Sequence, residues 1–143
     1  MKRGGFLKRK TGLKKKSKQS ISLIQRKLWE HCRRIQLKAL ANKDGTVDCY
    51  TCPAKNLQGS NRQLGHVPWP KSTLGAFLKY DLRILKWQCM RCNQFMGGMG
   101  GDAYLRMHEE NGAEYMSQLQ NDRQVTLKAY DHFIELLEKY KKL

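Results

Sequence analysis

The sequence lacks any long apolar run and is poor in acidic residues and in proline. Its 143 residues include only 12 Asp and Glu and 3 Pro. No stretch approaches the roughly 18 apolar residues that a membrane-spanning helix requires. The basic N-terminus is not followed by an apolar segment with a small-residue cleavage site, which argues against a secretory signal. We therefore expect a cytoplasmic protein with no membrane partner, and neither a membrane protein nor a secreted enzyme.

Positive charge is abundant and concentrated in the first third of the chain. The 28 Lys and Arg give a net charge of +16, and residues 1–43 hold 15 of them against one acid, Glu30. Residues 1–19 are too polar to form a packed core and are predicted to be a disordered basic arm. The arm is expected to contact DNA phosphates, or else to act only as a solubilising tail. The predicted DNA contacts in the arm are Lys8, Arg9, Lys10, Lys14, Lys15, Lys16 and Lys18.

Two amphipathic helices are predicted to flank a central domain. Residues 20–44 begin with a capping box, Ser22 to Gln25, and place apolar residues at helical spacing. Residues 45–120 are the predicted core, and residues 121–143 form a last helix that begins near Asp122. The apolar stripe of this last helix, which includes Val125, fits either packing onto the domain or a homodimer contact. The further DNA contacts expected on the first helix are Arg26, Lys27, Arg33 and Arg34.

Four of the five cysteines form two CxxC pairs. Cys49 and Cys52 make the first pair, and Cys89 and Cys92 make the second. Two such knuckles can supply the four thiolates of a tetrahedral structural Zn²⁺ site. Redox motifs or disulfides are the alternatives, and a basic chain without a secretion signal disfavours disulfides. Cys32 lies on the apolar stripe of the first helix and is expected to be an inert core residue.

Several segments around the knuckles resemble a known family. QLGHVPWP, YDLRILKWQCMRCN and GGMGGDAYLRMHEENGAEYMSQL occur in this order. They resemble the phage NinG/Rap recombination proteins and, more widely, the HNH or ββα-metal endonucleases. The resemblance covers about residues 47–120. It implies an α+β, mostly helical fold, with a small zinc-braced ββα-metal core flanked by helices.

The resemblance also implies a function and a set of site residues. The family cleaves DNA, so a metal-dependent endonuclease acting on branched DNA or Holliday junctions in recombination is expected. His66 corresponds to the general base, and Asn93 to a ligand of a catalytic Mg²⁺ or Mn²⁺. Asp81 and Asp102 are further candidate ligands of that ion. Symmetric cutting of a junction would call for a homodimer.

The sequence departs from the wider HNH pattern at two positions. Gly65 stands where many HNH enzymes carry a metal ligand, although NinG-like proteins also have glycine there. Ile84 stands where the central Asn of the motif would orient the base, which leaves Asp81 as the nearest polar candidate. Two other functions explain the charge and the cysteines: a non-catalytic zinc-ribbon DNA-binding protein and a ribosome-associated RNA-binding protein. Neither of these two functions explains why the Gly-His and CxxCN motifs occur together.

Overall fold

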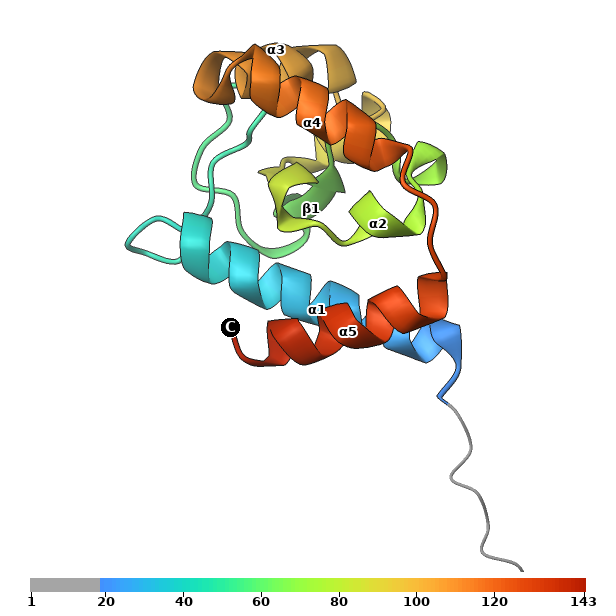
Figure 1. Cartoon of the computed structure of the whole chain (residues 1–143). Helices are drawn as coiled ribbons and strands as arrows, with labels where there is room; N and C mark the ends of the chain where they lie inside the picture. The colour runs from blue at the N-terminus through green and yellow to red at the C-terminus, as the bar shows by residue number, and fades with distance from the viewer. Residues whose placement is uncertain (1–18) are drawn as a thin grey trace, which may run out of the picture.

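A computed structural model describes residues 19–143 as seven helices and strands joined by loops and short turns (Figure 1). The predicted arm contacts between Lys8 and Lys18 lie outside the described residues. The fold is mostly helical with one two-stranded sheet, in agreement with the predicted class. The elements are α1 (Ile21–Leu40), β1 (Gln63–His66), α2 (Ala76–Lys79), β2 (Leu85–Gln88), α3 (Gly100–Asn111), α4 (Ala113–Arg123) and α5 (Ala129–Lys141).

The elements form three levels in Figure 1. Helices α1 and α5 lie side by side at the bottom, and α3 and α4 lie at the top. Between them lie α2 and the sheet of β1 and β2, called the hairpin below. Strands β1 and β2 are antiparallel, with Leu64 opposite Trp87 and His66 opposite Leu85. Outside this sheet, Val47 forms an isolated antiparallel bridge to Leu57.

Helix α1 begins two residues earlier than the capping-box prediction. The Ser20 hydroxyl, rather than that of Ser22, accepts from the Leu23 amide at 3.3 Å. A polar residue, Gln36, takes a buried place on the inner face of α1. Its amide nitrogen donates to the carbonyls of Leu82 and Leu85 at 2.8 and 2.7 Å. This side chain therefore ties α1 to the start of β2.

Helix α5 begins at Ala129, not near Asp122, because α4 continues to Arg123 and a short linker follows. Val125 lies in this linker and is 40% exposed, so it is not part of the apolar stripe. Phe133, Leu137 and Tyr140 are buried in the core cluster that includes the inner face of α1. The stripe is thus covered within the chain, and the homodimer itself stays a prediction.

Two apolar clusters lie on either side of the hairpin. The first joins α1, α5 and the hairpin, and the Tyr140 hydroxyl in it donates to the Tyr80 carbonyl at 2.6 Å. The second joins α2, α3 and α4 through Leu78, Met107 and Leu119. Within residues 19–143, no helix combines the length and apolar character of a membrane span.

Phe133→Ala should destabilise the protein strongly. Phe133 is 1% exposed, and its ring meets that of Tyr80 edge-to-face at 5.2 Å. Truncating a buried phenylalanine typically costs about 3–5 kcal/mol of unfolding free energy. Urea denaturation followed by circular dichroism measures this loss, with Val125→Ala as the exposed control. A loss below about 1 kcal/mol for Phe133→Ala would contradict the packing of α5 described here.

Candidate metal centre and active site

The two CxxC pairs converge on one point. Cys89 directly follows β2, and the loop that carries Cys49 and Cys52 runs beside that strand because the Tyr50 amide donates to the Trp87 carbonyl. The four Sγ atoms lie within 4.8 Å of one another, and those of Cys52 and Cys89 are 3.7 Å apart. Four sulfurs at about 2.3 Å from a tetrahedral zinc ion would be about 3.8 Å apart. The spacing therefore fits a structural metal ion such as zinc, as the cysteine pattern predicts.

Backbone amides point at the sulfur atoms. The amides of Cys89, Cys92 and Ala54 donate to the Sγ atoms of Cys49, Cys89 and Cys52 at 3.3, 3.4 and 3.5 Å. Burial raises the pKa of the Cys49 thiol, but hydrogen bonds from the Cys89 and Thr51 backbone outweigh it and bring the pKa to about 6. A thiolate at neutral pH is the form that binds metal.

Cys32 behaves differently from the clustered cysteines. It is fully buried in α1, outside the group, and burial followed by the charge of Asp81 raises its thiol pKa to about 12. The thiol stays protonated and points at the Tyr80 carbonyl, with a sulfur–oxygen distance of 3.8 Å. The structure thus agrees with the prediction that Cys32 is an inert core residue.

His66 ends β1, and its ring is fixed on two sides. Nε2 lies 2.8 Å from the Lys79 carbonyl oxygen, and because a carbonyl only accepts, Nε2 carries the proton. The ring stacks on Trp29 of α1 with centroids 5.3 Å apart and an interplanar angle of 10°. Burial lowers the pKa of His66 against the opposing hydrogen bond, and the charges of Lys71 and Lys79 lower it further. At neutral pH the imidazole is therefore uncharged, with a lone pair on Nδ1.

The Lys79 carbonyl, not Asp81, orients the His66 ring. Ile84 is fully buried and has no polar group, and Asp81 instead forms a double hydrogen bond to Arg83. Arg83 also pairs with Asp122 on α4 at 2.8 Å. Asp81 therefore belongs to a structural ion-pair network and does not orient His66. A backbone carbonyl leaves no signal in the sequence, because every residue has one.

Asn93 lies in the short turn that follows the second knuckle. Its side-chain nitrogen donates to Gln63 Oε1 at 2.9 Å, which leaves Oδ1 facing Gly65. A Cβ at position 65 would lie 2.8 Å from Asn93 Oδ1 and closer still to Gln88 Oε1. Position 65 therefore requires glycine, because two amide oxygens pack against its backbone and leave no room for a Cβ. Gln88, which sequence reasoning missed, is fully buried, and its Oε1 has no partner.

The structure places His66 and Asn93 on opposite faces of the hairpin. Consecutive strand residues point to opposite sides, and the missing side chain of Gly65 would point toward Asn93. His66, the next residue, points toward Trp29 and α1. The two predicted catalytic residues thus lie on opposite sides of the β1–β2 sheet and are not in contact.

Asp102 is not the N-cap of its helix. Helix α3 begins at Gly100 after Met99, and Asp102 lies exposed in the first turn. Among residues 19–143, the only group of three or more His, Cys, Asp or Glu ligands is the cysteine cluster. The structure therefore brings neither Asp81 nor Asp102 into such a group.

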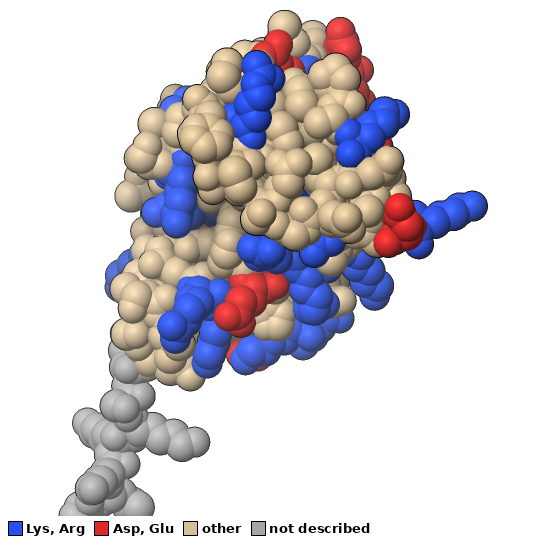
Figure 2. All heavy atoms as spheres, turned by 180° about the vertical axis from the view of Figure 1, so that it is seen from behind, with Lys and Arg blue, Asp and Glu red and all other residues tan. Residues whose placement is uncertain are grey.

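The basic residues of α1 differ in their surroundings. Arg26 and Arg33 are exposed, and Lys27 is half-buried. Arg34 donates to the Tyr140 carbonyl at 3.0 Å, so it also ties α1 to the end of α5. Figure 2 shows Lys and Arg gathered over the lower half of the molecule, the half that holds α1 and α5.

No protein-family model matches the chain, and no curated protein or solved structure matches it. The resemblance to the NinG/Rap proteins stays a prediction, and the function is inferred from the residues and geometry described above.

Removing the metal should unfold the central domain, because metal binding and folding are coupled in small zinc domains. Cys92→Ser is expected to abolish stoichiometric zinc binding and the cooperative thermal transition. Elemental analysis and circular dichroism measure the two effects. Cys32→Ala, which removes a buried thiol outside the cluster, is the control that should retain zinc. A metal-free Cys92→Ser protein with an unchanged transition would contradict a structural role for the metal.

Proposed function

We propose that this protein is a metal-dependent endodeoxyribonuclease that hydrolyses phosphodiester bonds, with branched DNA as its substrate. The observation that carries the proposal is the state of His66. The hydrogen bond to Lys79 fixes the tautomer, and burial keeps the ring uncharged. A neutral imidazole with a free lone pair is the form that a general base requires.

In the proposed reaction, His66 acts on a water molecule. Nδ1 accepts a proton from the water as its oxygen forms a bond to phosphorus and the bond from phosphorus to the leaving oxygen breaks. The proton then returns to solvent or to the leaving oxygen. Because burial and the nearby Lys71 disfavour the charged imidazolium, they favour its rapid deprotonation. The Lys79 carbonyl holds the ring in place throughout.

The proposal places the divalent cation on the side of the β1–β2 sheet opposite His66. Asn93 Oδ1 and the unpartnered Gln88 Oε1 both approach Gly65, and amide oxygens are suitable ligands for Mg²⁺ or Mn²⁺. When bound, such an ion would offset negative charge on the phosphate. Neither amide is charged, so most of the ion's affinity would come from phosphate oxygens of the DNA. DNA must then reach both faces at the end of β1.

Cationic side chains near His66 support a DNA substrate. A cavity of about 250 Å³ lies beside Trp29 and Tyr80, and Arg26 and Lys71 line it. Exposed Arg33 lies two helical turns from Arg26 on the same face of α1. Together with the basic arm, these groups could hold the phosphate backbone beside the proposed base.

A non-catalytic zinc-braced DNA-binding protein is the second candidate. The stacking of Trp29 on His66 and the separation of His66 from Asn93 favour it, because a histidine packed against an aromatic ring can be purely structural. This candidate has the same metal centre and basic surface as the proposed nuclease. It differs only in that it does not cleave the DNA that it binds.

Cleavage of a labelled four-way junction beside a matching linear duplex, with Mg²⁺ or Mn²⁺, tests the proposal. We expect junction cutting, and a loss of about 10²- to 10⁴-fold in His66→Ala with DNA affinity retained. His108→Ala removes an exposed imidazole on α3 and should cut normally. Tight binding without cutting, or equal cutting by wild type and His66→Ala, would contradict the nuclease.

The pH dependence of cutting gives a separate test. Because the pKa of His66 is lowered from the ordinary 6.5, its base form is already dominant at pH 7. The single-turnover rate should be flat through neutrality and fall only as the pH drops below 6.5. Lys71→Met removes a positive charge that lowers the pKa of His66. This variant should therefore begin to lose its cutting rate at a higher pH than the wild type. A fall in the wild-type rate that depends on His66 and is centred above pH 7 would contradict the role of His66 as the general base.

A further inference from the structure

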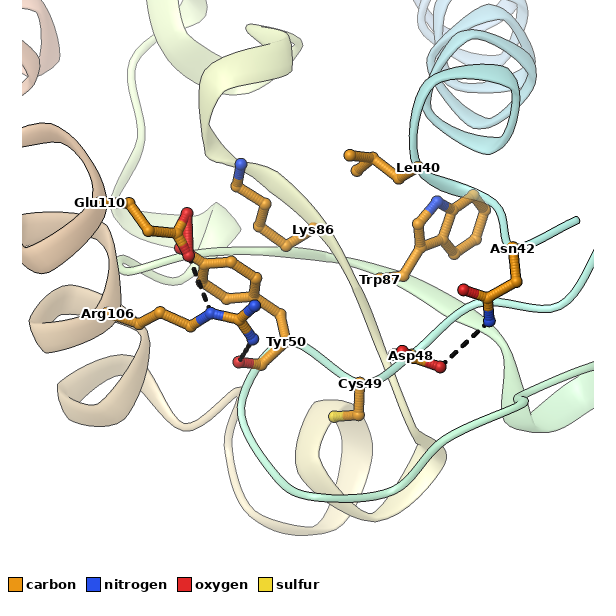
Figure 3. A pocket seen from close by; sticks show the side chains of 9 residues that line it. All are labelled: Leu40, Asn42, Asp48, Cys49, Tyr50, Lys86, Trp87, Arg106 and Glu110. Atoms are coloured by element: carbon orange, nitrogen blue, oxygen red, sulfur yellow. Dashed lines mark hydrogen bonds and ion pairs between the residues drawn. The ribbon is translucent and has the colours of Figure 1, made fainter.

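The charged side chains around the cavity between the end of α1, β2 and α3 have partners within the protein (Figure 3). The volume of this cavity is about 270 Å³. Glu110 accepts from Arg106 at 2.8 Å, and Arg106 also donates to the Tyr50 carbonyl at 2.6 Å. Burial lowers the pKa of Lys86, and the charge of Glu110 opposes this shift. The acidic and basic groups around the cavity therefore offset one another.

Phe95 and Met96, which we call the apolar pair, are exposed shortly after the second CxxC pair. Phe95 is 74% exposed, and Met96 is 45% exposed. Neither side chain belongs to the two apolar clusters within residues 19–143. Isolated apolar residues are common on protein surfaces, but an exposed aromatic ring beside an exposed methionine is a candidate contact site.

Backbone hydrogen bonds fix the apolar pair to the metal cluster. The Met96 amide donates to the Arg91 carbonyl at 2.8 Å. The Gly98 amide donates at 2.8 Å to the carbonyl of Cys92, which is a member of the cluster. The Gly98 carbonyl accepts from the buried Gln88 side chain, also at 2.8 Å. Because this backbone is already ordered, a ligand that contacts the pair loses little free energy in ordering it.

The apolar pair lies close to the proposed cleavage residues. Asn93 is two residues before Phe95 in the chain. A Cβ added at Gly98 would lie 3.9 Å from the His66 carbonyl oxygen, so the chain that follows the pair passes the end of β1. Gly97, directly after the pair, has open space where a Cβ would lie. Nucleotides next to a phosphate bound at the end of β1 would therefore be within reach of the pair.

The charge around the apolar pair suits nucleic acid. Residues 82–101 contain three basic residues and no acidic residue. Arg91, at the start of the turn that ends with Phe95, is exposed and forms no side-chain hydrogen bond or ion pair within residues 19–143. The nearest acids along the chain are Asp81, which pairs with Arg83, and Asp102. Proteins bind unpaired bases with this combination of an aromatic ring and a basic side chain.

The size of the apolar pair favours a nucleobase over a protein partner. A phenylalanine offers roughly 150–250 Å² of contact surface. Each side of a stable protein interface covers roughly 800 Å². One ring and one thioether are too small for such an interface, but they match the face of one base. In a continuous duplex both faces of each base are covered by neighbouring bases, so a free face occurs only where the stacking is interrupted.

We propose that Phe95 stacks on an exposed base at the branch point of the DNA, with Met96 against the same base and Arg91 on a neighbouring phosphate. The inference rests on the proposed function, and it gives a physical reason for a preference for branched over linear DNA. A linear duplex offers no free base face, so Phe95 contributes little to binding it.

Binding of the full-length zinc-loaded protein to a four-way junction and to the matching linear duplex tests the contact. Mg²⁺ and Mn²⁺ are omitted, so that binding is measured without cleavage. Phe95→Ala should weaken junction binding by roughly ten- to hundred-fold, as expected for the loss of one stacking ring, and leave duplex binding unchanged. Phe95→Trp keeps a stacking ring and should retain the junction affinity, whereas Phe95→Leu should not.

Leu143→Ala is the matched control, because it removes an exposed apolar side chain that follows α5. Since Phe95 is exposed, Phe95→Ala should keep the zinc content and thermal transition of the wild type, which separates a lost contact from misfolding. Equal junction affinities for the wild type and Phe95→Ala would overturn the proposal. An equal loss of affinity for both DNAs would overturn it as well.

Photochemical cross-linking locates the contact directly. A 5-iodouracil base placed at the branch point should form a cross-link to the aromatic ring that stacks on it. Mass spectrometry after digestion should find this base on the peptide that holds Phe95, and the link should be absent from Phe95→Ala. A base linked only to other residues would overturn the proposal.

The stacking contact and the nuclease fail in distinguishable ways. If the junction is not cut but Phe95→Ala selectively weakens its binding, the contact stands and the nuclease falls. If the junction is cut through His66 and Phe95→Ala binds it as tightly as the wild type, the reverse holds. An oligomer that dissociates in Phe95→Ala, with junction binding unchanged, would also overturn the contact and assign the apolar pair to an interface between copies of this chain.

Discussion

The convergence of four thiolates is the constraint on which the rest of the structure depends. The sheet has only two short strands, which is too little to be stable alone. The cysteine cluster joins the end of β2 to the loop beside it and fixes the turn that carries Asn93. Helices α1 and α5 cover one side of the hairpin, and α3 and α4 cover the other. A metal ion bound in the cluster would therefore stabilise the frame that holds both predicted catalytic residues.

Packing against this frame sets the chemistry of His66. Strand β1 places the ring against Trp29 of α1, and the carbonyl of Lys79, the last residue of α2, meets Nε2. Burial and two nearby lysines then keep the ring neutral. The same hairpin holds Asn93 on its opposite face, so the site can work as a nuclease only if the DNA engages both faces. The basic face of α1 lies on the side where His66 points.

Much of this could be predicted from local sequence patterns. CxxC spacing predicts the metal cluster because the turn geometry is local, and apolar periodicity predicts α1 and α5. Helix starts were less predictable: Ser20 and Ser22 are chemically equivalent caps, and only the fold selects one. The carbonyl that orients His66 and the amides that require Gly65 were not predictable, because they depend on tertiary contacts between groups with no distinctive sequence. The buried hydrogen-bond donors of the Trp87 and Gln36 side chains could not be predicted either, for the same reason.

The most direct measurement of the central claim is the protonation state of the His66 imidazole, from nitrogen-15 spectra of the zinc-loaded protein at pH 7. His66→Ala identifies its signals. We expect the neutral tautomer with the proton on Nε2 and a bare Nδ1, and we expect this state to be lost when a chelator removes the metal. An imidazolium, the opposite tautomer, or signals unchanged by metal removal would contradict the claim that a metal-braced hairpin holds His66 ready as a base.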